Sequence, residues 1–158
     1  IVGLQFAPDF LGRPFKAESD TNTEAATTVR LCSFPRSAVE RLMGDNPSLE
    51  HRLLQQTLKE LDEARGWMVT LGRKTAAEKV SSFLYLIATH SNPESGSDTS
   101  AAFELPLTRA DIADFLGLTI ETVSRQMTKL RKDGIIEIEN NRQVVVPDLD
   151  RLAQRASI

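Results

Sequence analysis

Two capped helical segments separated by a short turn place the strongest constraint on what this sequence can fold into. Thr108 and Asp111 have the spacing of a capping box, in which two side chains satisfy free N–H groups at a helix start. Gly117 then supplies a turn, and Thr119 caps a second helix that the pattern extends to about Asp133. Apolar residues give both helices one buried side: Ile112, Ala113, Phe115, Leu116, Val123, Met127 and Leu130.

Strand-forming segments flank this pair of helices. Residues 103–107 alternate as a short strand, and the proline within them favours a position at a sheet edge. Residues 135–138 and 143–146 predict two strands joined by a polar tip, which is a β-hairpin. Residues after Pro147 predict a short tail helix. Strand, helix, turn, helix and hairpin in this order indicate a winged helix-turn-helix.

The second helix presents side chains that suit DNA. Glu121, Ser124 and Arg125 share one face, because residues three and four apart lie on the same side of a helix. Glutamate can accept a hydrogen bond from cytosine, and arginine can donate two to guanine. The net charge of −3 means that DNA contact requires a local basic patch, and residues 125–132 hold four basic residues and no acid. The candidates for phosphate contact are Thr108, Arg109, Thr119, Lys129, Arg131, Lys132 and Arg142.

Other functions compete with DNA readout. Glu121 and Arg125 could form only a surface ion pair, and winged helices can also bind proteins. An enzyme finds least support, because the chain has no glycine-rich phosphate loop, nucleophile elbow or paired-histidine motif. His51 and His90 have no partners at metal-ligand spacing, so we interpret both as ordinary surface or helix-end histidines.

A long helix is predicted over 47–71, after a short helix over 36–44. Pro47 suits the first turn of a helix, where its missing N–H costs nothing. Apolar residues on two faces indicate two neighbours, one of which could be a second copy of the helix; they could also all pack within one subunit. The candidate residues of a dimer interface are Leu54, Leu58, Leu61, Ala64, Arg65 and Met68.

A further capping box, Thr75 with Glu78, begins a helix that ends near His90. Its apolar face is formed by Val80, Phe83, Leu84 and Ile87. Residues 91–102 are polar and rich in turn formers, which predicts an exposed loop.

Residues 1–35 have no helical period. The apolar pieces 1–6 and 29–34 predict short strands, too few to complete a sheet, and the opening without methionine indicates a fragment. No apolar run reaches the roughly 20 residues of a membrane helix, and no secretory signal is visible. With a single cysteine, Cys32, no internal disulfide can form, so we expect a cytoplasmic protein that does not contact membranes.

Residues 107–134, LTRADIADFLGLTIETVSRQMTKLRKDG, resemble the CRP/FNR superfamily of bacterial transcription regulators. The Glu121-x-x-Ser124-Arg125 pattern resembles the FNR branch, and three upstream segments are also similar to it: 9–15, 25–37 and 73–88. The resemblance implies an α+β fold with three parts. These are the tail end of a β-roll sensor domain over 1–46, a dimerisation helix over 47–72 and a winged helix-turn-helix over 73–158.

The resemblance also implies a function. A homodimer would bind double-stranded DNA at a TTGAT-like palindrome, with Glu121, Ser124 and Arg125 at the base-contacting positions. RNA polymerase would be a further partner of this regulator.

Cys32 is similar to one of four cysteines that hold a [4Fe–4S] cluster in oxygen-sensing members of the branch. The resemblance therefore implies oxygen control through a cluster in the intact protein, with Cys32 as the fourth ligand. This chain has no other cysteine, so no cofactor is expected in the chain as given. The alternatives are a cluster-free member of the superfamily and a small buried cysteine that fills a strand.

Overall fold

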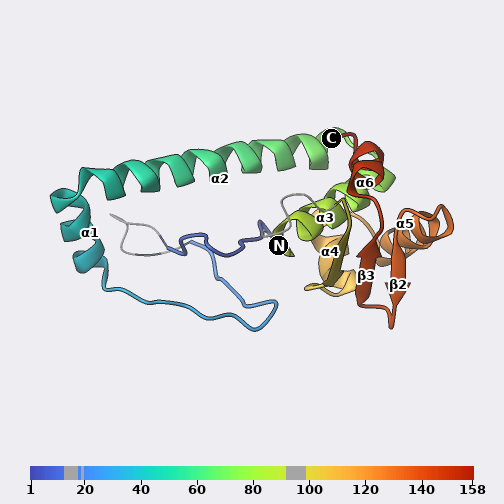
Figure 1. Ribbon diagram of the computed structural model, residues 1–158, viewed down its shortest axis with the longest axis horizontal. Coiled ribbons are helices and arrows are strands. Elements are labelled where there is room, and N and C mark those ends of the chain that lie inside the picture. Colours follow the sequence, from blue (N-terminus) through green and yellow to red (C-terminus); the bar gives the residue numbers. More distant parts are fainter. Residues whose placement is uncertain (13–17, 19, 92–98) are drawn as a thin grey trace. The chain divides into compact units, whose positions relative to one another are not determined.

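The computed structural model describes residues 1–12, 18, 20–91 and 99–158 (Figure 1). These residues divide into two compact units. We call Ile1–Leu4 with Gly66–Ile158 the C-terminal unit and Gln5–Arg65 the N-terminal unit. Parts of the predicted 91–102 loop and of the 9–15 segment lie outside the described residues.

Two helices follow one another from residue 36. Helix α1 covers Arg36–Asp45, and α2 covers Pro47–Arg73, which confirms both predicted helices. Asn46 separates them in a non-helical conformation, as expected for a residue before proline. Helix α2 has 27 residues, but neither it nor any other helix within the described ranges is apolar enough to cross a membrane.

The strands predicted within 1–35 are not formed. Residues 1–6 and 29–34 are irregular in the structure, and Val29 and Leu31 are 54% and 66% exposed. A strand must pair its backbone N–H and C=O groups with a neighbour, and the strands that the structure describes all lie after residue 100 and pair only with one another. The prediction of strands here is wrong, because local apolar content cannot supply the pairing partner.

The C-terminal unit combines helices with a small antiparallel sheet. Its sheet has the order β1-β3-β2, so β1 is an edge strand, as the nearby proline indicated. The predicted first strand is displaced toward the N-terminus, to residues 101–104. The elements are α3 (Ala76–Ser91), β1 (Ala101–Glu104), α4 (Arg109–Leu116), α5 (Ile120–Lys132), β2 (Glu137–Glu139), β3 (Gln143–Val146) and α6 (Leu149–Ala156).

Helix α3 lies at the centre of this unit, in contact with α5, α6 and β1. Its predicted apolar face is buried throughout, and Phe83 packs edge-on against Phe115 of α4 with ring centroids 6.2 Å apart. Fully buried side chains from α4, α5, α6, β3 and the segment before β2 complete the core together with those of α3, among them Leu84, Ile112, Leu116, Val123, Ile136, Val144 and Leu152. An α+β fold with a C-terminal winged helix-turn-helix is therefore confirmed.

The wing is a tight hairpin. Asn140 and Asn141 at its tip both have positive φ, at 48° and 60°, and the Arg142 N–H donates to the Glu139 carbonyl at 3.2 Å. Two successive left-handed residues form the turn that matches the twist of a hairpin, and asparagine adopts this conformation more readily than most residues. This local chemistry explains why the predicted hairpin is present.

Candidate nucleic-acid interface

Side-chain caps hold the helix-turn-helix in place. Thr108 Oγ1 accepts from the Asp111 N–H at 3.2 Å, while Asp111 Oδ2 accepts from the Thr108 N–H at 3.1 Å. Gly117 ends α4 with φ of 62°, in the left-handed region that favours glycine. Thr119 Oγ1 then accepts from the Thr122 N–H at 3.2 Å and begins α5. Each cap expected from the sequence is formed, so the direction of α5 is set locally.

Helix α5 has one buried and one exposed side. Val123 and Met127 on the inner side are 0% and 2% exposed. The predicted base readers Glu121, Ser124 and Arg125 are all exposed on the outer side. The structure thus brings these three side chains together on an accessible face.

A shallow groove follows the outer side of α5 toward its C-terminus. Three basic side chains and one acidic side chain border this groove. The lining residues are Ser124, Arg125, Thr128, Lys129, Lys132 and Asp133. A cationic groove beside a base-reading face can hold the sugar–phosphate backbone.

The alternative ion pair between Glu121 and Arg125 is not formed among the described residues. Arg125 Nη2 instead lies 3.5 Å from Thr122 Oγ1. A hydrogen bond from its own backbone N–H, and then one from the Thr119 hydroxyl, hold the pKa of the Glu121 carboxyl below its ordinary value. Glu121 is therefore ionised at neutral pH and is available as a hydrogen-bond acceptor.

The candidate phosphate contacts differ in accessibility. Thr108, Thr119, Lys129, Arg131 and Lys132 are exposed. Helix starts and lysines of this kind are common phosphate partners.

Two arginines of that set are engaged elsewhere. Arg109 is half-buried, its guanidinium donates to Met127 Sδ, and burial lowers its pKa below the ordinary value for arginine. Arg142 Nε lies 3.6 Å from Glu104 Oε1, and both side chains are more than half exposed. The Arg142 pair is weak enough for DNA to displace it, whereas Arg109 would have to leave its packed position.

Ile120 is a surface residue that the sequence reasoning missed. Its side chain is 47% exposed at the first position of α5, next to Glu121. An apolar group there could contact a thymine methyl. The sequence position of Ile120, directly after the N-cap, could have identified it as a candidate, because recognition helices read bases mainly with their N-terminal residues.

The predicted dimer residues of α2 are exposed. Leu54, Leu58 and Leu61 are 55%, 51% and 44% exposed, and Met68 is 71% exposed. Ala64 and Arg65 are exposed as well. Packing of this whole set within one chain, the alternative prediction, therefore does not occur among the described residues.

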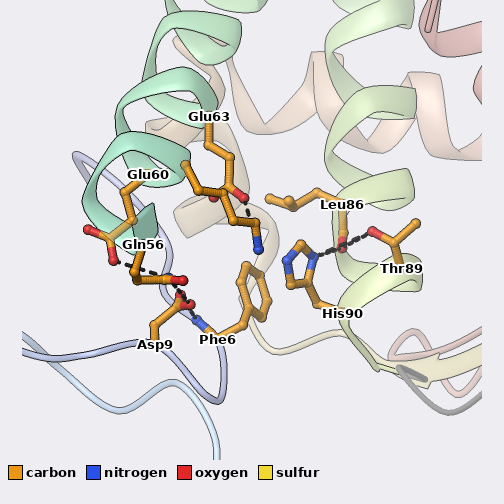
Figure 2. Close-up of polar contacts among 9 residues, drawn as sticks. Phe6, Asp9, Gln56, Glu60, Glu63, Leu86, Thr89 and His90 are labelled. Carbon is orange, nitrogen blue, oxygen red and sulfur yellow. Dashed lines mark hydrogen bonds and ion pairs between the residues drawn. The ribbon is translucent and has the colours of Figure 1, made fainter. Parts of the chain in front are cut away.

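The polar side of α2 has contacts within the N-terminal unit. Gln56 Nε2 donates to Asp9 Oδ1 at 3.0 Å and to Glu60 Oε1 at 3.3 Å (Figure 2). The Phe6 N–H donates to Asp9 Oδ2 at 2.9 Å. These bonds tie an irregular segment to α2 and leave the leucines uncovered.

The two histidines and Cys32 do not form a metal site among the residues that the structure describes. His90 Nδ1 lies 2.9 Å from the Leu86 carbonyl of its own helix (Figure 2). Cys32 is exposed, so its interpretation as a buried strand residue is wrong. A [4Fe–4S] cluster needs four ligands, and one cysteine in the whole sequence does not fit that requirement.

Comparison with known proteins identifies the architecture. Residues 78–155 match the Crp-like helix-turn-helix domain. The chain is 61% identical over 157 residues to a probable transcriptional activator of Rhizobium leguminosarum bv. viciae, covering 99% of this chain and 65% of that protein. The predicted resemblance to regulators of the CRP/FNR type is thereby confirmed, with residues 78–155 as a Crp-like helix-turn-helix domain. A second relative, the transcriptional activator protein FnrL of Cereibacter sphaeroides, is 44% identical over 158 residues, which are 99% of this chain and 64% of that protein.

A solved structure supports the same assignment. FixK2 from Bradyrhizobium japonicum is similar with a TM-score of 0.64 and 36% identity, over 75% of this chain and 57% of that chain. The chain therefore spans about 65% or less of the length of these relatives. The relatives are regulators rather than enzymes, which confirms the prediction that the chain is not an enzyme.

Proposed function

We propose that this chain is the DNA-binding and dimer-forming part of a cytoplasmic transcription activator that reads a TTGAT-like palindrome. The observation that carries the proposal is the exposed trio Glu121, Ser124 and Arg125 on a doubly capped helix, beside a cationic groove. The relatives named as transcriptional activators support the same direction of regulation. RNA polymerase is the further partner in this proposal.

Each member of the trio has its own role at the bases. The Glu121 carboxylate accepts from a cytosine amino group, and the Arg125 guanidinium donates two hydrogen bonds to guanine. Ser124, between them on the same face, reaches a base or a phosphate. A good contact of this kind contributes about 1–3 kcal/mol of discrimination between bases.

The remaining polar residues position the protein on the duplex. Lys129 and Lys132 contact phosphates at the groove, and the exposed Arg131 contacts a phosphate as well. Thr108 and Thr119 offer helix starts to the DNA backbone. Arg142 on the wing contacts a phosphate after it leaves Glu104. Such contacts raise the affinity for all sequences and make it dependent on salt.

A homodimer matches the symmetry of a palindrome. The exposed side chains Leu54, Leu58 and Leu61 recur at helical spacing on α2, where a second copy can cover them. Ala64, Arg65 and Met68 continue the same interface. The two recognition helices then meet half-sites one helical turn apart, about 34 Å.

DNA binding by the protein in its full natural length tests this proposal. Binding is measured without oxygen on a TTGAT palindrome and on a scrambled duplex at one salt concentration, because salt sets the non-specific background. We expect a clear preference for the palindrome that Arg125→Ala reduces. Equal affinity for the two duplexes contradicts base reading by Glu121, Ser124 and Arg125, and would favour a winged helix that binds proteins only.

Oxygen control is the second part of the proposal. The exposed Cys32 thiol is accessible as one ligand of an iron–sulfur cluster, provided that three further ligands come from outside this chain. Admission of air during the same binding experiment decides between the two forms of regulator. Binding that is lost in air supports a cluster, whereas binding that survives air favours a cluster-free regulator.

A further inference from the structure

Both ends of the recognition helix α5 are linked, through the ends of α4 and α6, to residues that lie outside α4 and α5. The segment 74–79, where α2 gives way to α3, supplies the side chains. Two of them, Lys74 and Lys79, are half-buried lysines, although lysine is rarely withdrawn from water without a partner. Both ammonium groups are therefore expected to have hydrogen-bond partners.

Lys79 binds the entry to α5. Its Nζ donates to the Leu116 carbonyl at 3.3 Å, at the last residue of α4. Two neighbouring carbonyls of this helix end are satisfied locally, since the Gly117 N–H donates to Asp114 and the Leu118 N–H to Ala113. The lysine thus holds a carbonyl immediately before the turn, where the partial negative charge of the helix end favours a cation.

Lys74 binds the last carbonyl of α6. Its Nζ donates to the Ala156 carbonyl at 2.6 Å and to Ser82 Oγ at 2.9 Å. The Ser157 hydroxyl donates to Glu78 Oε1 at 2.7 Å, which adds a second link to the same helix end. The C-terminus of α6 is therefore fixed against α3, beside which it lies in Figure 1.

Helix α6 in turn holds the exit from α5. Arg155 Nη2 donates to Asp133 Oδ2 at 2.9 Å, directly after the last residue of α5. Arg151 Nη1 lies 3.5 Å from the Gly134 carbonyl. Lys74 is thus linked to the exit of α5 through α6, as Lys79 is linked to its entry through α4.

We propose that Lys79 and Lys74 are positioning residues for base readout, which fix the direction of α5 from its two ends without touching DNA. The proposal rests on the proposed function, because base readout is the activity that the direction of α5 serves. A small rotation of α5 moves Glu121 and Arg125 away from the base edges, while phosphate contacts made by flexible lysines tolerate it.

The test compares specific with non-specific binding in the full-length protein. Lys79→Met and Lys79→Gln remove the ammonium group, Lys79→Arg retains a cationic donor, and Lys74→Met removes the second link. Lys59→Met is the matched control, because it also removes one positive charge but from an exposed ion pair with Glu63 on α2. Affinities for the palindrome and for the scrambled duplex are measured over a range of salt concentrations.

We expect Lys79→Met and Lys79→Gln to lower the ratio of specific to non-specific affinity about tenfold, the value of one good base contact. Lys79→Arg restores most of the ratio, and Lys59→Met leaves it unchanged. An unchanged ratio in the Lys79 variants overturns the proposal. Equal losses on both duplexes, with a shallower salt dependence, also overturn it, because they identify Lys79 as a phosphate contact.

Amide hydrogen exchange without DNA separates failure of this proposal from failure of the proposed function. We expect Lys79→Met to accelerate exchange at residues 117–123, and Lys74→Met to accelerate it at residues 130–134. If the unmodified protein has no palindrome preference but these changes occur, positioning of α5 stands and TTGAT readout is wrong. Unchanged exchange in α5 contradicts positioning whatever the DNA result.

Discussion

The two units of this molecule differ in where their apolar side chains lie. The C-terminal unit buries Phe83, Leu116 and Ile136 completely within one shared core. In the described part of the N-terminal unit, Met43 is the one buried hydrophobic side chain, while Leu31 and Phe34 are 66% and 64% exposed. A chain segment folds onto itself only where its elements meet complementary faces, and the N-terminal unit presents faces that need further neighbours.

The largest effect should come from the core of the C-terminal unit. Phe83→Ala removes a fully buried ring and should lower the free energy of unfolding by about 3–5 kcal/mol. Leu31→Ala in the N-terminal unit should change it by less than about 0.5 kcal/mol, because that side chain already contacts solvent. Denaturant unfolding followed by circular dichroism measures both, and equal losses would show that the two units do not differ as described.

Discrimination between bases should respond to substitutions in α5 of the C-terminal unit. Arg125→Ala should reduce discrimination between the palindrome and a scrambled duplex by about 1–3 kcal/mol, since it removes a base contact. Arg41→Ala, an exposed arginine on α1, removes the same charge from the N-terminal unit and should leave discrimination unchanged. Fluorescence anisotropy at fixed salt measures this difference, and a comparable loss in Arg41→Ala would argue against readout by α5.

Substitution of an exposed leucine on α2 tests whether a second copy of the chain packs against the N-terminal unit. Leu58→Glu should weaken self-association at least about tenfold, because it places a charge in an apolar contact. The neighbouring exposed Gln55→Glu adds the same charge and should have little effect. Sedimentation equilibrium measures both variants, and an unchanged dimer in Leu58→Glu would place the interface elsewhere.

The smallest effect concerns acid stability of the capped helices. Hydrogen bonds from the Thr75 hydroxyl, then from Ser157 and the Thr75 backbone, lower the pKa of the Glu78 carboxyl from 4.5 to about 2. A lowered folded-state pKa stabilises the protein above the unfolded value, and this contribution is lost as pH falls from about 4.5 to about 2. Thermal unfolding across this range should become less dependent on pH in Glu78→Gln.

Thr75→Ala provides the matched variant for that experiment, because it removes the largest cause of the shift while the carboxyl remains. It should reproduce much of the reduced pH dependence. A Glu78→Gln variant as sensitive to pH as the unmodified protein would mean that the cap does not contribute in solution.

Local sequence signals determined most of the C-terminal unit. The Thr108–Asp111 box, the Thr119 cap and the left-handed Gly117 each act through groups within four residues of one another, so they can be recognised without coordinates. The outer face of α5 follows from helical periodicity for the same reason. Even the wing depends on two adjacent asparagines at its tip.

Contacts between distant residues were decided only by the tertiary structure. Strands within 1–35 required partners that composition cannot supply, and Arg109 proved to be turned toward Met127 rather than freely exposed. Lys79 meets a carbonyl 37 positions away, and Lys74 meets one 82 positions away. Periodicity and capping describe neighbours along one helix, whereas these contacts depend on how the helices of the unit pack against one another.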